Sequence, residues 1–140
     1  MKKLVLFLVA VLLTLPVLAD DGRVIPFEKL PQPAKVLLKK YFVDQAPLIV
    51  KADWDDYEVI YENGVKVEFD KRGEWKDFDC RYTAVPEELV PGPIKAQVTA
   101  SYPGATIIKL KRDRRGYEVK LDNGLEIEFN KSFTIVDIDD

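Results

Sequence analysis

Histidine is absent from this chain, and cysteine occurs once. Without histidine there is no Ser-His-Asp triad, no histidine general base and no ordinary zinc site, and a single thiol cannot form an internal disulfide or a thiolate metal cluster. The phosphate-binding patterns Gly-x-Gly-x-x-Gly and Gly-x4-Gly-Lys-Ser/Thr do not occur either. We therefore expect no catalytic residues, no bound cofactor and no enzymatic activity. A carboxylate-only hydrolase is the remaining catalytic alternative, and it is disfavoured because the Glu residues alternate along predicted strands on an open face with nothing to bury them.

A basic excess is also missing, since 21 Lys and Arg residues face 24 Asp and Glu residues. Proteins that bind nucleic acid carry a broad positive surface, so nucleic acid is not the expected partner. The one cysteine, Cys80, lies where two halves of the chain join and is expected to be a small, partly buried residue. The alternative is a reactive or dimer-forming thiol.

Long apolar runs are limited to the N-terminus. Lys2 and Lys3 precede an apolar stretch, Leu4 to Leu15, and Val17-Leu18-Ala19 forms a small-residue cleavage pattern. The stretch is about a dozen residues, whereas a membrane-spanning helix needs roughly 20. Residues 1–19 are predicted to be a signal peptide cleaved after Ala19, which gives a periplasmic or secreted mature chain that does not insert into the membrane.

The mature chain contains an internal repeat. Shifting the sequence by 60 positions aligns Ile25–Asp79 with Val85–Asp139 without a gap, and about 17 of 55 positions are identical. The clearest stretch runs from Tyr57-Glu58-Val59 to Glu68-Phe69. Residues 20–80 and 81–140 are therefore predicted to be two copies of one module.

Within each copy the hydrophobic period changes from helical to extended. Pro33 and Pro93 suit the first turn of a helix, and apolar residues recur at helical spacing after them. Period-two alternation follows in four segments of each copy. The prediction is an α+β fold with one antiparallel sheet of about eight strands and both helices on one face.

The paired Asn63-Gly64 and Asn123-Gly124 mark hairpins. A two-residue loop would send the apolar residues of the two strands to opposite faces, whereas a three-residue loop pairs Tyr61 with Val65 and Tyr57 with Phe69. Gly64 should then adopt the left-handed conformation. These residues have a folding role and need no functional one.

The other face of the predicted sheet carries mixed charges and a few large apolar residues. A solvated face is the simple interpretation, and a recognition surface is the alternative, with Trp75 as its anchor. Trp75 is placed on this face because pairing Asp70 with Trp75 keeps Val67 opposite Phe78. The candidate partner-binding residues are Trp75, Ile60, Glu58, Lys66, Glu68, Asp77, Ile135, Lys120 and Glu128, and Glu118, Glu126 and Asp137 share the face.

The repeated helix with Tyr-Glu-Val, Asn-Gly and Glu-Phe strands, behind a signal peptide, resembles the PepSY-like, β-lactamase-inhibitor-protein-like family of exported bacterial proteins. The resemblance covers nearly all of the mature chain. It implies a curved antiparallel sheet with helices on its convex side. It also implies protein recognition, since the inhibitor grips an enzyme with its concave face and PepSY domains are thought to restrain peptidases.

Two loops at matching positions differ in charge. Asp53-Trp54-Asp55-Asp56 in the first copy corresponds to Asp113-Arg114-Arg115-Gly116 in the second. The loops are either simply solvated, or they select a partner or pair two molecules head to tail. Trp54, Arg114 and Arg115 are the candidate partner-binding residues here, and Trp54 is expected to be exposed.

Calcium is a further alternative at the acidic loop and at the tail residues Asp137, Asp139 and Asp140, although the EF-hand pattern is missing and no metal site is expected.

The preferred function is recognition of a protein or peptide by a monomer or weak homodimer, with regulation or inhibition of an envelope enzyme as one form of it. The alternative is a periplasmic protein that binds a small ligand or calcium.

Overall fold

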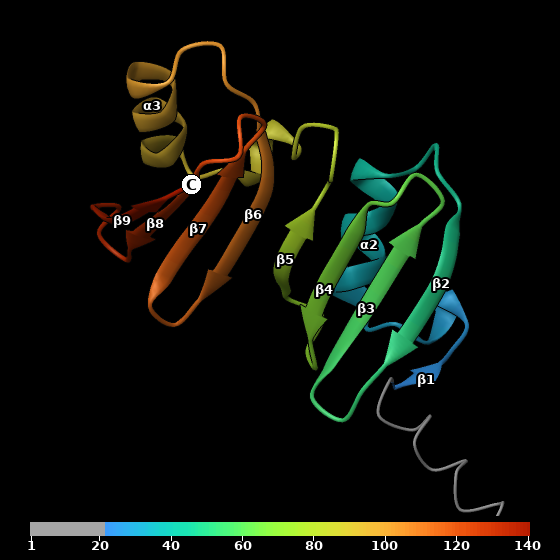
Figure 1. The fold of residues 1–140 in the computed structure, drawn as a ribbon. Helices are drawn as coiled ribbons and strands as arrows, with labels where there is room; N and C mark the ends of the chain where they lie inside the picture. The colour runs from blue at the N-terminus through green and yellow to red at the C-terminus, as the bar shows by residue number, and fades with distance from the viewer. Residues whose placement is uncertain (1–21) are drawn as a thin grey trace, which may run out of the picture.

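The structure, a computed structural model, describes residues 22–140 and contains two α-helices and one antiparallel sheet of nine strands in that part of the chain. The strands lie side by side in chain order, from β1 to β9 (Figure 1). Their bounds are β1 Arg23–Val24, β2 Pro47–Ala52, β3 Asp56–Tyr61, β4 Lys66–Asp70, β5 Trp75–Asp79, β6 Ile107–Asp113, β7 Gly116–Leu121, β8 Glu126–Asn130 and β9 Ile135–Asp139. The predicted α+β class is confirmed, with β1 as an additional strand that pairs with the end of β2.

The predicted signal peptide and its cleavage after Ala19 lie outside the described residues. From residue 22 onward, no helix combines the length and the apolar character needed to cross a membrane.

Each helix begins as its prolines predict. α2 spans Gln32–Tyr41 and α3 spans Gly92–Ser101, with a proline in the first turn of each. A short 3-10 helix precedes each one, η2 at Phe27–Lys29 and η3 at Glu87–Leu89. In Figure 1, α2 lies behind strands β3 and β4, so the viewer sees the face of the first half that has no helix.

The hairpin register is the one that the apolar pattern demands. Tyr57 pairs with Phe69 and Val59 with Val67, and the Tyr61 N–H donates to the Val65 carbonyl at 2.8 Å. Gly64 has φ +93°, in the left-handed region. The second half repeats these pairings 60 positions later, and the predicted three-residue loops are confirmed.

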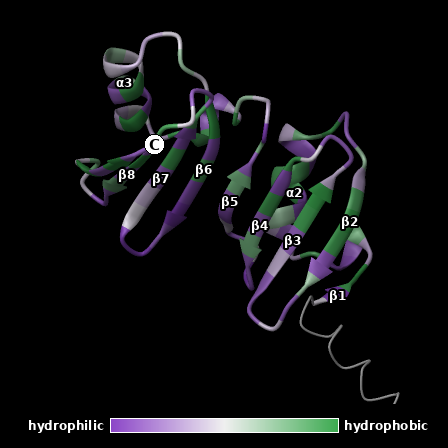
Figure 2. Ribbon diagram, in the orientation of Figure 1, coloured by the Kyte–Doolittle hydropathy of each residue, from purple (hydrophilic) through white to green (hydrophobic). Residues whose placement is uncertain are grey.

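One apolar face runs through both halves. Phe78 of β5 lies opposite Leu110 of β6, so the core residues of the two halves point to the same side of one continuous sheet. Ala34 and Leu38 of α2 and Ile94 and Val98 of α3 are buried in the same apolar cluster. Figure 2 shows the resulting alternation of hydrophobic and hydrophilic residues along the strands.

The predicted placement of Trp75 and Ile135 on the face without helices is wrong. Trp75 lies opposite Phe69, is 8% exposed and packs on Phe78 with ring centroids 5.0 Å apart. The Arg112 guanidinium covers the indole at 3.9 Å, and Arg112 Nε donates to the Trp75 carbonyl. Ile135 lies opposite Phe129 and packs against the same core.

A turn and a bulge explain this change of face. The Asp70 N–H donates to the Glu74 carbonyl, so Asp70 lies opposite Glu74 and not opposite Trp75. Trp75 then falls opposite Phe69, and one extra residue, Lys76, restores the register in which Val67 faces Phe78. Simple alternation counted from Phe78 misses this extra residue.

We expect Trp75→Ala to lower the free energy of unfolding by about 3 kcal/mol, because it removes a buried indole and leaves a cavity beside Phe78. Trp54→Ala is the matched control, since Trp54 is 78% exposed and its loss should change stability by less than about 0.5 kcal/mol. Urea unfolding followed by circular dichroism compares them. Equal midpoints for the two variants would contradict the packing role of Trp75.

Candidate binding surface

The sheet face opposite the helices carries a continuous row of charged side chains. Directly paired positions run across strands β2 to β9 and form what we call the central row. Its members, in order, are Lys51, Glu58, Glu68, Asp77, Lys111, Glu118, Glu128 and Asp137. Six carboxylates and two ammonium groups therefore share one line, and several carboxylates face one another directly, which is destabilising in the free protein.

Few of these carboxylates have a cationic partner. Lys66 Nζ lies 3.6 Å from Glu58, and Lys109 Nζ lies 3.9 Å from Asp77. Among residues 22–140, Glu68, Glu118, Glu128 and Asp137 form no ion pair. The row is thus an acidic band whose charge is only partly neutralised.

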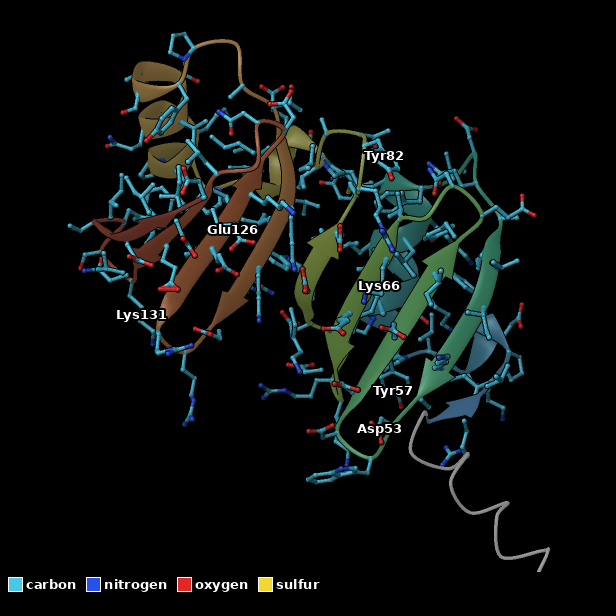
Figure 3. The ribbon with its side chains drawn as sticks, viewed as in Figure 1. Asp53, Tyr57, Lys66, Tyr82, Glu126 and Lys131 are labelled. Carbon is cyan, nitrogen blue, oxygen red and sulfur yellow. The ribbon has the colours of Figure 1, made fainter. Side chains whose placement is uncertain are left out.

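A parallel row lies beside it on the same face. Ile60, Lys66, Asp79, Lys109, Lys120 and Glu126 occupy consecutive paired positions of strands β3 to β8. Lys66 and Glu126 are labelled in Figure 3. Of the nine sheet-face residues predicted to bind a partner, the structure brings all except Trp75 and Ile135 onto this face.

Asp77 is the buried member of the central row, at the junction of β5 and β6. It is 9% exposed, and its Oδ1 has no hydrogen-bond partner among the described residues. Burial raises the pKa of Asp77 to about 6; Lys109 opposes this rise, and Glu68, directly opposite, adds to it. Ionised Asp77 therefore costs the folded protein stability.

Two hollows occupy matching places on the face. The second-half hollow has a volume of about 400 Å³, and its lining includes Lys111, Asp113, Gly116, Glu118, Glu128 and Val136. The first-half hollow has about 180 Å³ and is lined by Gly22, Lys51, Asp53, Asp56, Glu58 and Glu68. In the first half, Asp56 and Lys76 form an ion pair at 3.5 Å, whereas the equivalent positions of the second half carry Gly116 and Val136.

The two charged loops lie beside these hollows. Trp54 is 78% exposed, as expected, and follows Asp53, which is labelled in Figure 3. In the other loop the Arg115 guanidinium lies 3.5 Å from the Asp113 carboxylate, and the backbone N–H groups of Arg115 and Gly116 hold the pKa of Asp113 below its ordinary value. Arg114 is exposed.

Sequence reasoning missed two exposed residues on or near this surface. Val136, 58% exposed, takes the bulge position that corresponds to Lys76 and forms an apolar wall of the second-half hollow. Tyr82, 90% exposed and labelled in Figure 3, lines a further hollow of about 550 Å³ with Arg81, Lys109 and Lys120. Its position just after the first repeat is the only sequence feature that singles it out.

Cys80 is 2% exposed, and burial raises the pKa of its thiol to about 12. The thiol is therefore protonated at neutral pH and inaccessible, which agrees with the expected packing role.

Two helices packed on one side of an antiparallel meander, with the other side open and charged, define this chain as an open-faced α+β protein. The family model described as "Putative beta-lactamase-inhibitor-like, PepSY-like" matches residues 55–137, and the chain belongs to this family. The resemblance seen in the repeated motifs is confirmed.

Three solved structures from two Bacteroides species are similar to the chain. A Bacteroides thetaiotaomicron protein described as a "putative calcium-regulated periplasmic protein" is 42% identical, with a TM-score of 0.83 over 87% of this chain and 99% of its own. A putative periplasmic protein from Bacteroides vulgatus is 44% identical, with a TM-score of 0.82 and the same coverage. A second Bacteroides vulgatus periplasmic protein, of unknown function, is 32% identical, with a TM-score of 0.78 over 82% of this chain and 95% of its own. A search of curated proteins finds no match.

Replacing Asp77 by Asn should make stability less dependent on pH. Because the folded state holds a proton on Asp77 up to about pH 6 and the unfolded chain only to about pH 4, ionisation in this window costs native stability as the pH rises. The stability of Asp77→Asn relative to the parent should therefore increase by on the order of 2 kcal/mol between pH 4 and pH 7.5.

Urea unfolding at several pH values measures that difference. Asp137→Asn is the matched control, because Asp137 occupies the equivalent position 60 residues later and is exposed. A constant difference between the parent and Asp77→Asn across this pH range would contradict the assignment.

Proposed function

We propose that this chain is an exported, non-enzymatic binding protein of the cell envelope whose open sheet face binds a protein or peptide rich in Lys and Arg. The observation that carries the proposal is the central row, in which carboxylates outnumber ammonium groups on one exposed face. A cationic partner would relieve the repulsion between carboxylates that face one another.

The charge of the opposite side supports this choice of face. α2 carries Lys35, Lys39 and Lys40, and Lys29 lies in the 3-10 helix before it. A partner with excess positive charge is therefore attracted to the sheet face and repelled by the helix side of the first half. Electrostatic complementarity of this kind sets orientation and association rate more than final affinity.

The remaining parts of the proposal follow from the sequence and the relatives. The solved relatives are described as periplasmic, which supports an envelope location for this chain. The absence of histidine and the buried, protonated Cys80 support a non-enzymatic role. The recurrence of the strand register 60 positions apart supports two tandem copies of one module. Regulation of an envelope enzyme is one form that binding would take.

The test is fluorescence anisotropy with two labelled peptides of equal length, one alternating Lys and Ala and the other alternating Glu and Ala. The mature chain should bind the basic peptide, and binding should weaken as salt screens the charges. Glu68→Lys should reduce this affinity about tenfold, since it reverses one charge at the middle of the row. It should not unfold the protein, because a lysine there faces Asp77.

Glu28→Lys is the control for this charge reversal. Glu28 is exposed on the 3-10 helix before α2, away from the sheet face. Equal losses in the two variants, or equal binding of the basic and acidic peptides, would contradict the proposal. A partner can then be sought in envelope extract, with Glu68→Lys as the bait that fails to retain it.

Calcium binding at the β2–β3 loop is the second candidate. The carboxylate oxygens of Asp53, Asp55 and Asp56 come within 4.8 Å of one another, the one such cluster found among residues 22–140. The tail carboxylates do not form a comparable cluster in that range. A relative that is 42% identical is described as calcium-regulated, and oxygen ligands suit Ca²⁺. Lys76, which lies 3.5 Å from Asp56, would have to move aside.

If Ca²⁺ binds at this loop, it should raise the unfolding midpoint of the mature chain, because an ion that binds only the folded state stabilises it. Asp55→Asn should abolish the increase, whereas Asp44→Asn, at an exposed acidic position after α2, should preserve it. Differential scanning fluorimetry with and without a chelator measures both. A Ca²⁺ response that Asp55→Asn leaves intact would exclude the loop.

A further inference from the structure

We infer that the second-half hollow is the subsite that receives a single Lys or Arg side chain of the partner. The inference rests on the proposed function and deepens it, because it selects one place on the acidic face. The hollow has a volume of about 400 Å³, and its lining includes Lys111, Arg115, Gly116, Glu118, Glu128 and Val136.

The second-half hollow is larger than the first-half hollow, and two side chains of the first half have no counterpart there. Position 56 carries Asp and position 76 carries Lys, and these two side chains pair at 3.5 Å. The equivalent positions carry Gly116 and Val136. In the first half, therefore, a lysine of the chain itself pairs with a carboxylate that lines the hollow, and the equivalent positions of the second half supply neither group.

Gly116 cannot be replaced by a larger residue without displacing the neighbouring strand. Its φ is +148°, and an added Cβ would come within 2.0 Å of the Phe129 carbonyl oxygen. The backbone of β7 thus approaches β8 closely at the floor of the hollow. No side chain therefore extends from this position into the hollow.

The lining suits a group with an apolar stem and a cationic head. Val136, 58% exposed, offers the apolar wall. Glu118 and Glu128 lie directly opposite each other and form no ion pair within the described part of the chain. Lys and Arg bury their methylene stems on apolar surface and place their charge on carboxylates.

The neighbouring cations form no ion pair with these glutamates within the described part of the chain. Arg115 lies against Asp113 at 3.5 Å with its side chain 91% exposed, and Lys111 lines the hollow directly opposite Glu118 without pairing with it. The volume also exceeds what one ion needs, since a water molecule occupies about 30 Å³ of liquid. A side chain fits this space better than a bare metal ion.

The test replaces Val136 by Lys, which provides the second half with the intramolecular cation that Lys76 supplies in the first. Val136→Lys should reduce the affinity for the alternating Lys-Ala peptide roughly fivefold or more, because the new ammonium group competes for Glu118 and Glu128. Leu48→Lys adds the same charge at an exposed position of β2, where Leu48 is 64% exposed, and should have a much smaller effect. Unfolding midpoints confirm that both variants fold.

Backbone amide chemical shifts locate the peptide on the ¹⁵N-labelled mature chain. Shifts concentrated at Gly116, Glu118, Glu128 and Val136, and lost in Val136→Lys, support the subsite. Shifts spread along the central row in both halves and unaffected by Val136→Lys overturn the subsite and leave the proposed function standing. No binding of the basic peptide at about 1 mM overturns both. Shifts of the same amides by Ca²⁺ alone would assign the hollow to a metal and overturn the inference.

Discussion

The pairing of β5 with β6 is the contact on which the rest of this structure depends. With Phe78 opposite Leu110, the two halves form one sheet with one core side and one open side. Arg112 strengthens the junction, because its guanidinium covers Trp75 and its Nε donates to the Trp75 carbonyl. A register shifted by one residue would point the apolar residues of the second half into solvent. The same pairing places Asp77 beside Lys111 and makes the central row continuous.

Most of the fold follows from patterns that act locally. Proline in the first helical turn, period-two alternation and the Asn-Gly loops each have a short-range cause, and the structure bears out all three. The faces of Trp75 and Ile135 could not be read in this way, because a bulge adds one residue without changing composition. The turn at Asp70 places Asp70 opposite Glu74 at one end of the β4–β5 hairpin, and the core contact of Phe78 places it opposite Val67 at the other end. The two pairings differ by one residue, and the bulge at Lys76 accommodates that residue. The charged residues of the open face were predictable because they lie in parts of the strands where the bulge does not interrupt the alternation of side chains.

Removing Trp75 and Ile135 from the open face changes the kind of recognition that it supports. An exposed indole would have been a hydrophobic anchor of the sort that dominates many interfaces. What remains is the acidic central row, flanked by a parallel row with three lysines and Ile60 and by Val136, and the central row favours a partner that brings positive charge. The corrected face therefore supports a narrower proposal than the sequence did, namely a basic protein or peptide.

The two halves differ in charge and shape at matching positions of the open face. The first half has the Asp56–Lys76 pair beside a hollow of about 180 Å³, whereas the second half has Gly116 and Val136 and a hollow of about 400 Å³. The adjacent loops also differ in charge, since Asp53, Asp55 and Asp56 form a cluster of carboxylates while Arg114 and Arg115 bring positive charge.

Asp77 lies between the halves with a raised pKa, and Glu68 directly opposite contributes to the rise. Because a cation bound near Glu68 would lower the pKa of Asp77, occupation of the row and ionisation of its buried member are thermodynamically linked, and binding should weaken as the pH falls toward 5.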